Sequence, residues 1–156
     1  MSKSTVRVLL VDDFESWRRF VSSTLRQRPE FEILCEVSDG LVAVEKAEEL
    51  RPDLVLMDVG LPMLNGIEAA RQILERAPQS RVLFLSENRS SDIAQEALRT
   101  GAGGYVLKVD AGRELLTAVD AVLQGKQFLS ASLVGRQATE PSNGKCPPSL
   151  ERSSKR

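Results

Sequence analysis

Five side chains of this sequence could together carry out one kind of chemistry. They comprise three carboxylates, one hydroxyl and one ammonium group, and they are Asp12, Asp13, Asp58, Ser86 and Lys108. Carboxylates that meet in one crevice repel each other unless a cation is present. Mg²⁺ suits such a crevice because it takes oxygen ligands from a few carboxylates, retains water and pairs with phosphate oxygens. A carboxylate beside Mg²⁺ can attack phosphorus and form an aspartyl phosphate, so the set predicts phosphoryl transfer.

Each of these residues also has an ordinary structural explanation when it is taken alone. Asp12 or Asp13 can cap the helix that starts near Phe14. Ser86 can form a hydrogen bond with its own backbone, and Lys108 can be a surface lysine. The functional interpretation therefore depends on whether the fold brings the side chains together.

The chain alternates segments of strand-like and helix-like periodicity. The expected strands are residues 5–11, 31–37, 53–57, 81–86 and 104–107. The expected helices are residues 14–28, 40–51, 66–76, 92–100 and 110–125. Such alternation predicts an α/β fold whose parallel sheet is covered by helices on both faces. Right-handed crossovers then limit the topology to a doubly wound, five-stranded, flavodoxin-like (βα)5 sheet.

The carboxyl ends of the strands line the working crevice of such a sheet. The two neighbouring acids, Asp12 and Asp13, follow the first expected strand, and Asp58 follows the third. Ser86 ends the fourth strand and Lys108 follows the fifth. The predicted topology therefore gathers all of these groups at one place.

The expected strands differ in how far they should be covered by helices. Residues 31–37 alternate apolar and polar side chains, as in a half-buried or edge strand. Within the expected strands 53–57 and 81–86, the apolar runs LVLM (54–57) and VLFL (82–85) indicate strands buried on both faces. In the helix after the first strand, Trp17 and Phe20 belong to one apolar stripe.

Composition restricts the class of protein. The chain has 156 residues with 42% apolar side chains, which suits one globular domain. It contains no histidine, which excludes a Ser-His-Asp triad. No apolar run approaches the length of about 20 residues that spans a membrane, and the N-terminus does not resemble a signal peptide. Cys35 and Cys146 lie far apart, so we expect a reducing compartment and a cytoplasmic location.

Charge is distributed unevenly along the chain. Residues 1–135 carry a net charge of −4 and residues 136–156 carry +3. A body this acidic is unlike a general nucleic-acid binder. We expect residues 1–130 to form the folded domain. The segment 131–156 is rich in proline and serine and poor in apolar residues, which predicts a disordered C-terminal tail.

Four segments resemble the receiver domain of two-component response regulators. They are LLVDD (9–13), LVLMDVGLPMLNG (54–66), VLFLSEN (82–88) and GAGGYVLK (101–108). The resemblance covers about residues 5–130 and is greatest to the NarL/FixJ-like subfamily. It implies a signalling switch in phosphorelay signal transduction, not a conventional enzyme: the protein would catalyse only its own phosphotransfer and dephosphorylation.

The resemblance implies a role for each acidic residue. Asp58 would accept the phosphoryl group from a sensor histidine kinase or a phosphotransfer protein. Asp13 and Asp58 would bind Mg²⁺ directly, together with the backbone carbonyl of Gly60, while Asp12 would act partly through water. No membrane partner is implied.

The resemblance also implies how phosphorylation would be transmitted. Ser86 and Lys108 would bind the phosphoryl oxygens. Tyr105 matches the aromatic switch residue whose ring turns inward on activation, although on its own it could be an ordinary half-buried strand aromatic. The output surface would comprise the fourth helix, fifth strand and fifth helix. It would bind an unidentified protein partner, and it is also compatible with a homodimer.

Three features depart from the family pattern. The subfamily usually continues into a helix-turn-helix domain, whereas this sequence has no room for one, so we expect a stand-alone receiver without direct DNA binding. Glu87 follows Ser86 where a small residue is usual, and an acid there would repel phosphate. Val109 follows Lys108 where many receivers have proline.

Three other functions use a similar fold or a similar acidic site. A degenerate receiver would bind partners without phosphorylation, and Glu87 is the feature that supports it. A haloacid-dehalogenase-like phosphatase would need a second aspartate two residues after Asp58, where this chain has Gly60. A flavodoxin would need a phosphate-binding loop after the first strand, which is lacking.

Overall fold

The computed structural model of the protein describes residues 5–133. Its strands are β1 (Val6–Val11), β2 (Phe31–Val37), β3 (Leu54–Met57), β4 (Arg81–Ser86), β5 (Gly104–Leu107) and β6 (Phe128–Leu129). Its helices are α1 (Glu15–Leu25), α2 (Gly40–Leu50), α3 (Gly66–Arg76), α4 (Ser91–Leu98), the short 3₁₀ helix η1 (Lys108–Asp110) and α5 (Ala111–Leu123). The predicted β–α alternation is confirmed, with small differences at the ends of elements.

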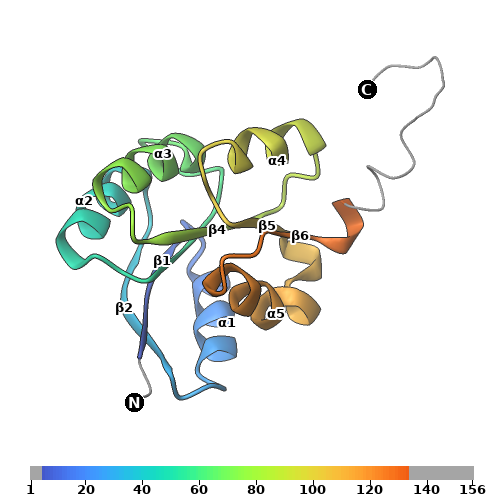
Figure 1. The fold of residues 1–156 in the computed structure, drawn as a ribbon, viewed down its shortest axis with the longest axis horizontal. Helices are drawn as coiled ribbons and strands as arrows, with labels where there is room; N and C mark the ends of the chain where they lie inside the picture. Colours follow the sequence, from blue (N-terminus) through green and yellow to red (C-terminus); the bar gives the residue numbers. More distant parts are fainter. Residues whose placement is uncertain (1–4, 134–156) are drawn as a thin grey trace.

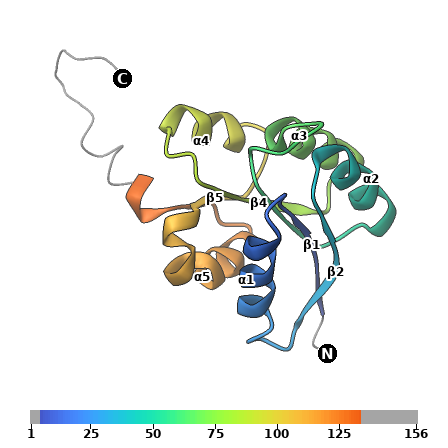
Figure 2. The same ribbon diagram turned by 180° about the vertical axis from the view of Figure 1, so that it is seen from behind.

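All strands are parallel and lie in the order β2-β1-β3-β4-β5-β6. Helices α2, α3 and α4 cover one face of this sheet, and α1 and α5 cover the other (Figures 1 and 2). The strand order reverses between β1 and β3, so the carboxyl ends of these two strands form the crevice expected of a doubly wound sheet. The flavodoxin-like fold class is therefore confirmed.

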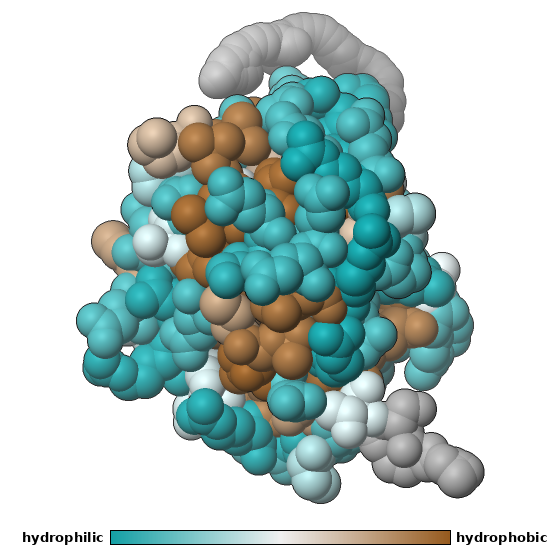
Figure 3. Space-filling model, turned by 90° about the vertical axis from the view of Figure 1, so that its left-hand side faces the viewer, coloured by the Kyte–Doolittle hydropathy of each residue, from teal (hydrophilic) through white to brown (hydrophobic). Residues whose placement is uncertain are grey.

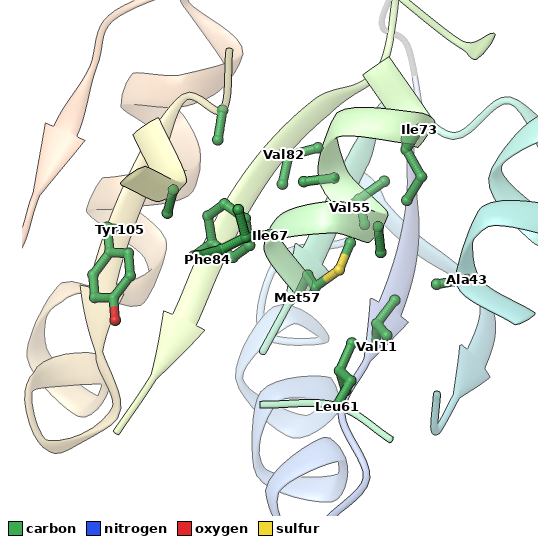
Figure 4. Packing of buried hydrophobic residues seen from close by; sticks show 14 of the residues in the cluster. Val11, Ala43, Val55, Met57, Leu61, Ile67, Ile73, Val82, Phe84 and Tyr105 are labelled. Atoms are coloured by element: carbon green, nitrogen blue, oxygen red, sulfur yellow. The ribbon is translucent and has the colours of Figure 1, made fainter. Parts of the chain in front are cut away.

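Side chains of β1 alternate between two buried clusters. Leu9 and Val11 pack toward α2 and α3 in the cluster of Figure 4, whereas Val8 and Leu10 pack in the cluster against α1 and α5. Every residue of β3 is buried. A strand covered on both faces reads as a continuous apolar run, and residues 54–57 form such a run.

Strand β2 lies at the edge of the sheet, as its alternating pattern predicted. It pairs only with β1 among the described strands, and Ile33, Leu34 and Cys35 are half-buried. Figure 3 shows apolar side chains gathered on the side of the molecule where β2 and α2 lie. Leu41 of α2 is exposed. The second cysteine, Cys146, lies outside the described residues.

The sequence did not predict β6. Phe128 and Leu129 follow α5 after a short turn and pair in parallel with Gly104 and Tyr105 of β5. Two residues are too few to show a strand periodicity, and this strand depends on a tertiary contact with β5. The sheet therefore has six strands where we expected five.

Two other expectations need correction. Residues 131–133, which we assigned to the disordered tail, are helical, and Leu133 is fully buried. The rest of that tail, residues 134–156, lies outside the described residues. In α1, Phe20 is exposed instead of entering the core, and its ring lies against the ring of Trp17 with centroids 5.0 Å apart.

No helix in residues 5–133 is both long enough and apolar enough to cross a membrane.

Candidate functional site

Three carboxylates meet at the crevice between β1 and β3. Asp12 and Asp13 follow β1 and Asp58 follows β3, and one oxygen of each lies within 4.8 Å of the others. The two strands are held in register, since Val11 is paired with Met57 and the Asp58 N–H donates to the Val11 carbonyl at 3.1 Å. The prediction that the topology gathers these acids is confirmed.

Lys108 completes the charge arrangement from the other side. It begins η1 directly after β5, and its Nζ lies 2.7 Å from Asp12 Oδ2 and 3.6 Å from Asp58 Oδ2. The side chains of Lys108 and Asp12 are only 8% and 2% exposed. The interpretation of Lys108 as an ordinary surface lysine is thus wrong.

The two oxygens of Asp12 have different partners. Oδ1 accepts a hydrogen bond from the Phe14 N–H at 2.9 Å, so Asp12 also shapes the turn into α1. Oδ2 faces Lys108 and forms no regular hydrogen bond with any described residue. Asp13, by contrast, is exposed at the mouth of the crevice. Asp12 thus has a structural role in the turn before α1, although the N-cap of the helix is Phe14 and no side chain caps it.

Asp58 is electrostatically strained. Burial raises its pKa above the ordinary value of 3.8, the Lys108 charge lowers it, and the neighbouring Asp12 raises it again. Hydrogen bonds from the backbone of Gly60 and Val59 also lower it, but the net direction is upward. A carboxylate held next to another carboxylate favours any cation or positive group that can share its charge.

The loop after Asp58 turns sharply into α3. The Gly66 N–H donates to the Val59 carbonyl at 2.7 Å, and the Asn65 side chain caps α3 by accepting from the Glu68 N–H at 3.0 Å. A Cβ atom on Gly66 would lie only 2.0 Å from the Asp58 carbonyl oxygen. Gly60, in contrast, is exposed and has open space where a Cβ would lie. Gly66 is therefore required by close backbone approach, whereas Gly60 is not.

An open cleft of about 470 Å³ lies over these groups. Its lining combines the predicted site residues with neighbours from three loops: Asp13, Phe14, Asp58, Val59, Gly60, Ser86, Glu87, Asn88 and Lys108. Asp12 is beneath the cleft and is not part of its lining. Glu87 is exposed at the rim, so a negative charge does border the entrance as the sequence suggested.

A hydrogen-bonded chain links Ser86 to Tyr105. Ser86 Oγ is buried and accepts the Asn88 N–H at 3.0 Å, and the Tyr105 hydroxyl donates to the Asn88 carbonyl at 2.8 Å. Tyr105 is fully buried, so its ring points inward in this structure. Burial raises the pKa of the Tyr105 phenol, which keeps it protonated as a donor. The loop between β4 and α4 is thus fixed from both sides.

Sequence reasoning missed two aromatic residues of the site. Lys108 Nζ lies 5.0 Å from the centroid of the Trp17 ring and 6.0 Å from that of Phe14, within the range of cation–π attraction. Trp17 lies in the first turn of α1, which begins just after the acids, and this position is a signal that could have placed it near the site.

The site residues fit a hard divalent cation. Their oxygens are close enough together to share one ion, and Asp12 Oδ2 is a buried acceptor with only an ion-pair partner among the described residues. Carboxylate oxygens are the ligands that Mg²⁺ prefers. The site therefore has the donor set of an acidic metal pocket.

The sequence profile of the response regulator receiver domain matches residues 8–120. The chain belongs to this family. The predicted resemblance is confirmed, and response regulators are signalling proteins of two-component systems. The transcriptional regulatory protein DegU of Brevibacillus brevis is 36% identical to this receiver over 129 residues, which cover 83% of this chain and 55% of DegU. The response regulator protein VraR of Staphylococcus aureus is 36% identical over 130 residues, covering 83% and 62%. This chain spans between about half and two thirds of the length of these relatives.

Solved structures agree with the fold of this receiver. A LuxR-family two-component response regulator from Aurantimonas sp. SI85-9A1 superposes with a TM-score of 0.83 at 34% identity, over 88% of this chain and 98% of that one. The response regulator domain of Thermotoga maritima CheB gives a TM-score of 0.71 at 34% identity, over 77% and 97%.

Proposed function

We propose that this receiver is a Mg²⁺-dependent phosphoacceptor whose phosphorylation site is Asp58. The observation that carries the proposal is the contrast between the acids. Asp12 is buried beneath the cleft and paired with Lys108, and Asp13 is exposed at its mouth. Asp58 lines the cleft at the end of a rigid buried strand, with Oδ2 3.6 Å from Lys108. It alone combines access with fixed position and a nearby cation.

The transfer itself needs no histidine base. An Asp58 carboxylate oxygen attacks phosphorus, and a new O–P bond forms as the bond between phosphorus and the donor's leaving atom breaks. The leaving group keeps the bonding electron pair, and for a phosphohistidine donor that atom is an imidazole nitrogen. Positioning and charge neutralisation supply most of the catalysis in such transfers, so the protein's contribution is to hold Asp58 and the incoming group in line.

Mg²⁺ would be held by the carboxylates of Asp12, Asp13 and Asp58 and by the Gly60 carbonyl. When bound, it supplies positive charge that offsets the repulsion between the carboxylates and the phosphoryl oxygens. Lys108 supplies a second positive charge to these oxygens, and the Ser86 hydroxyl donates a hydrogen bond to one of them. Because Ser86 is joined through Asn88 to Tyr105, this hydrogen bond would transmit phosphorylation to the switch residue.

The partners follow from this chemistry. A sensor histidine kinase or phosphotransfer protein would donate the phosphoryl group, in a cytoplasmic setting. The altered surface of α4, β5 and α5 would bind a protein partner, or a second copy of the receiver, instead of DNA. The acidic net charge of residues 1–135 supports this assignment. That the receiver works without a DNA-binding domain stays a prediction.

One observation favours an alternative function. Glu87 borders the cleft with a negative charge that would repel a phosphodonor. A receiver with this feature could bind partners without phosphorylation, and the same experiment tests both functions.

The experiment is intact-mass measurement after incubation with a small acyl phosphate. We expect wild type to gain one hydroxylamine-labile phosphoryl group with Mg²⁺ and none with EDTA. Asp58→Asn should gain none, while Asp92→Asn, which removes an exposed acid of α4, should behave as wild type. Absence of any gain in the wild type would support the degenerate receiver, and a gain with EDTA would remove the metal's role.

A further inference from the structure

The chain that follows α5 is bonded to the strand that carries Tyr105 and leads to Lys108. The Phe128 N–H donates to the Gly103 carbonyl at 3.0 Å, and the Ser130 N–H donates to the Tyr105 carbonyl at 3.0 Å. The Leu107 N–H donates to Ser130 Oγ, also at 3.0 Å. Ser130 therefore spans β5 from Tyr105 to Leu107 and is itself fully buried.

Two carboxylates close around Ser130 from the other side. Ser130 Oγ lies 2.9 Å from Asp110 Oδ2 and 2.7 Å from Glu114 Oε1. The second oxygen of Glu114 accepts the Ala131 N–H at 3.1 Å, at the start of the helical turn 131–133. Carboxylates stabilise the N-terminal end of a helix. We call residues 128–133, together with Asp110 and Glu114, the C-terminal latch.

The latch also shares the hydrophobic core with the switch residue. Leu133 is fully buried in the cluster that contains Tyr105 and Leu107, and Leu129 packs against the same cluster. Lys108 lies between two latch contacts in the chain, one residue after Leu107 and two before Asp110. A displacement of the Lys108 backbone toward a group on Asp58 would therefore act on Leu107 and Asp110, two residues that are hydrogen-bonded to Ser130.

We propose that the C-terminal latch reads the state of Asp58, so that phosphorylation tightens residues 128–133 on β5 and fixes where the chain leaves the receiver. This inference rests on the proposed function. The phosphoryl group adds negative charge next to Lys108 and attracts its ammonium group. This attraction would restrain the end of β5 and η1, and therefore Leu107 and Asp110, which are both hydrogen-bonded to Ser130. The surface expected to change on activation would then include the edge of the sheet at β6, in addition to α4, β5 and α5.

The latch has fewer hydrogen-bond donors than acceptors around Ser130, so substitutions that add or remove a donor should change its stability in opposite directions. A serine hydroxyl has one proton, so Ser130 can donate to only one of the two carboxylates. Burial raises the pKa of Asp110, but hydrogen bonds from Ser130 and Ser132 and the Arg113 charge outweigh it and leave the pKa below its ordinary value. Whichever carboxylate receives the Ser130 proton, the other faces the hydroxyl oxygen at close range without a hydrogen bond from it.

Glu114→Gln should tighten the latch. The glutamine N–H₂ group can donate to Ser130 Oγ while its oxygen still accepts the Ala131 N–H. Ser130→Ala should loosen the latch, since it removes the acceptor of the buried Leu107 N–H and the donor to Asp110. Thr117→Ala, which removes an exposed hydroxyl from α5, is the matched control.

The test is amide hydrogen exchange at residues 128–133, followed by NMR in the full chain. With Mg²⁺ and beryllofluoride as the probe for a phosphorylated Asp58, we expect at least a threefold slowing of exchange at Ser130 and none in Asp58→Asn. Without the probe, exchange should be at least tenfold faster in Ser130→Ala, slower in Glu114→Gln, and unchanged in Thr117→Ala. If Ser130→Ala does not fold, Glu114→Gln alone decides the direction.

Failure of the latch and failure of the proposed function give different results. A phosphoryl mass gain at Asp58 with unchanged exchange at Ser130 would overturn the latch alone. If wild type takes up no phosphoryl group, the proposed function fails, and Lys108→Met then decides the coupling. Physical coupling between Lys108 and the latch is supported if this variant speeds exchange at Ser130 more than at the amides of β1, and the latch is overturned if both change equally.

Discussion

Lys108 Nζ lies 2.7 Å from Asp12 Oδ2, and both side chains are almost fully buried. This ion pair holds the end of β5 against the end of β1 across β3 and β4. It also leaves Lys108 within 3.6 Å of Asp58, close enough to move to a new group there. The ion pair is thus a structural contact, and its lysine is also the positive charge available to the proposed phosphoryl group.

Loss of the ammonium should destabilise the fold. Lys108→Met leaves Asp12 as an uncompensated buried charge beside two other carboxylates, and breaking a buried pair in this way costs about 3–5 kcal/mol. Urea unfolding at neutral pH measures the loss. Saturating Mg²⁺ should recover part of it, because a cation that binds only the folded state stabilises that state. Lys126→Met, at an exposed position, is the control, and an equal loss in both variants would contradict the argument.

Trp17 should report occupation of the site. It is the only tryptophan in the chain, and its ring lies 5.0 Å from Lys108 Nζ. Beryllofluoride with Mg²⁺ should draw the ammonium toward Asp58 and produce a saturable change in Trp17 emission. The change should disappear in Lys108→Met and in Asp58→Asn. An undiminished change in Lys108→Met would show that another group causes it.

The raised pKa of Asp58 sets a pH dependence of stability. Its folded-state pKa lies above the ordinary value of 3.8, chiefly because of burial. Between these two pKa values the folded state binds more protons than the unfolded state, so this residue makes stability fall as pH rises through the window. Asp58→Asn should therefore be more stable than wild type at neutral pH, by about 0.5–2 kcal/mol.

Unfolding curves at neutral pH and below pH 3.8 test this sign. The advantage of Asp58→Asn should shrink toward zero at the acidic end, where wild-type Asp58 is protonated in both states. A constant advantage at all pH values would instead indicate improved packing or hydrogen bonding.

Two glycines of the loop after Asp58 should respond differently to the same change. Gly66→Ala places a Cβ 2.0 Å from the Asp58 carbonyl oxygen, a backbone atom that cannot move cheaply. We expect a loss of more than about 2 kcal/mol. Gly60→Ala meets no atom within 4 Å and should change stability by less than about 0.5 kcal/mol. Thermal unfolding of the two variants distinguishes them, and equal losses would contradict the close approach at Gly66.

Glu87 should slow phosphorylation by a charged donor. It is exposed at the rim of the cleft, where its charge repels an incoming phosphate. Glu87→Gln should therefore accelerate phosphorylation by a small acyl phosphate by about 2–10-fold at low ionic strength. Salt screens exposed charges, so the difference should narrow as salt is added. Glu96→Gln, another exposed acid, should have no effect.

Much of the site was determined by local sequence. Short continuous apolar runs such as residues 54–57 indicate strands covered on both faces, and parallel strands place their carboxyl ends together. The positions of Asp12, Asp13, Asp58, Ser86 and Lys108 along the chain therefore implied that they meet. The loop that ends in Gly66 could also be predicted from the sequence, because its glycine and capping asparagine mark a turn into a helix.

Only the tertiary structure determined the burial and the partners of each of these groups. One oxygen of Asp12 accepts from the Phe14 N–H and the other faces Lys108. This division depends on the burial and orientation of the side chain, which the spacing of residues in the sequence does not determine. Trp17 of α1 lies against Lys108 of η1 although the two residues are far apart along the chain, and only the packing of the elements on the sheet brings them together. Strand β6 and the buried Leu133 exist because β5 offers an unpaired edge after α5 has crossed the sheet. The sequence alone determined which groups meet, and long-range packing decided which of them are buried, paired or open to a partner.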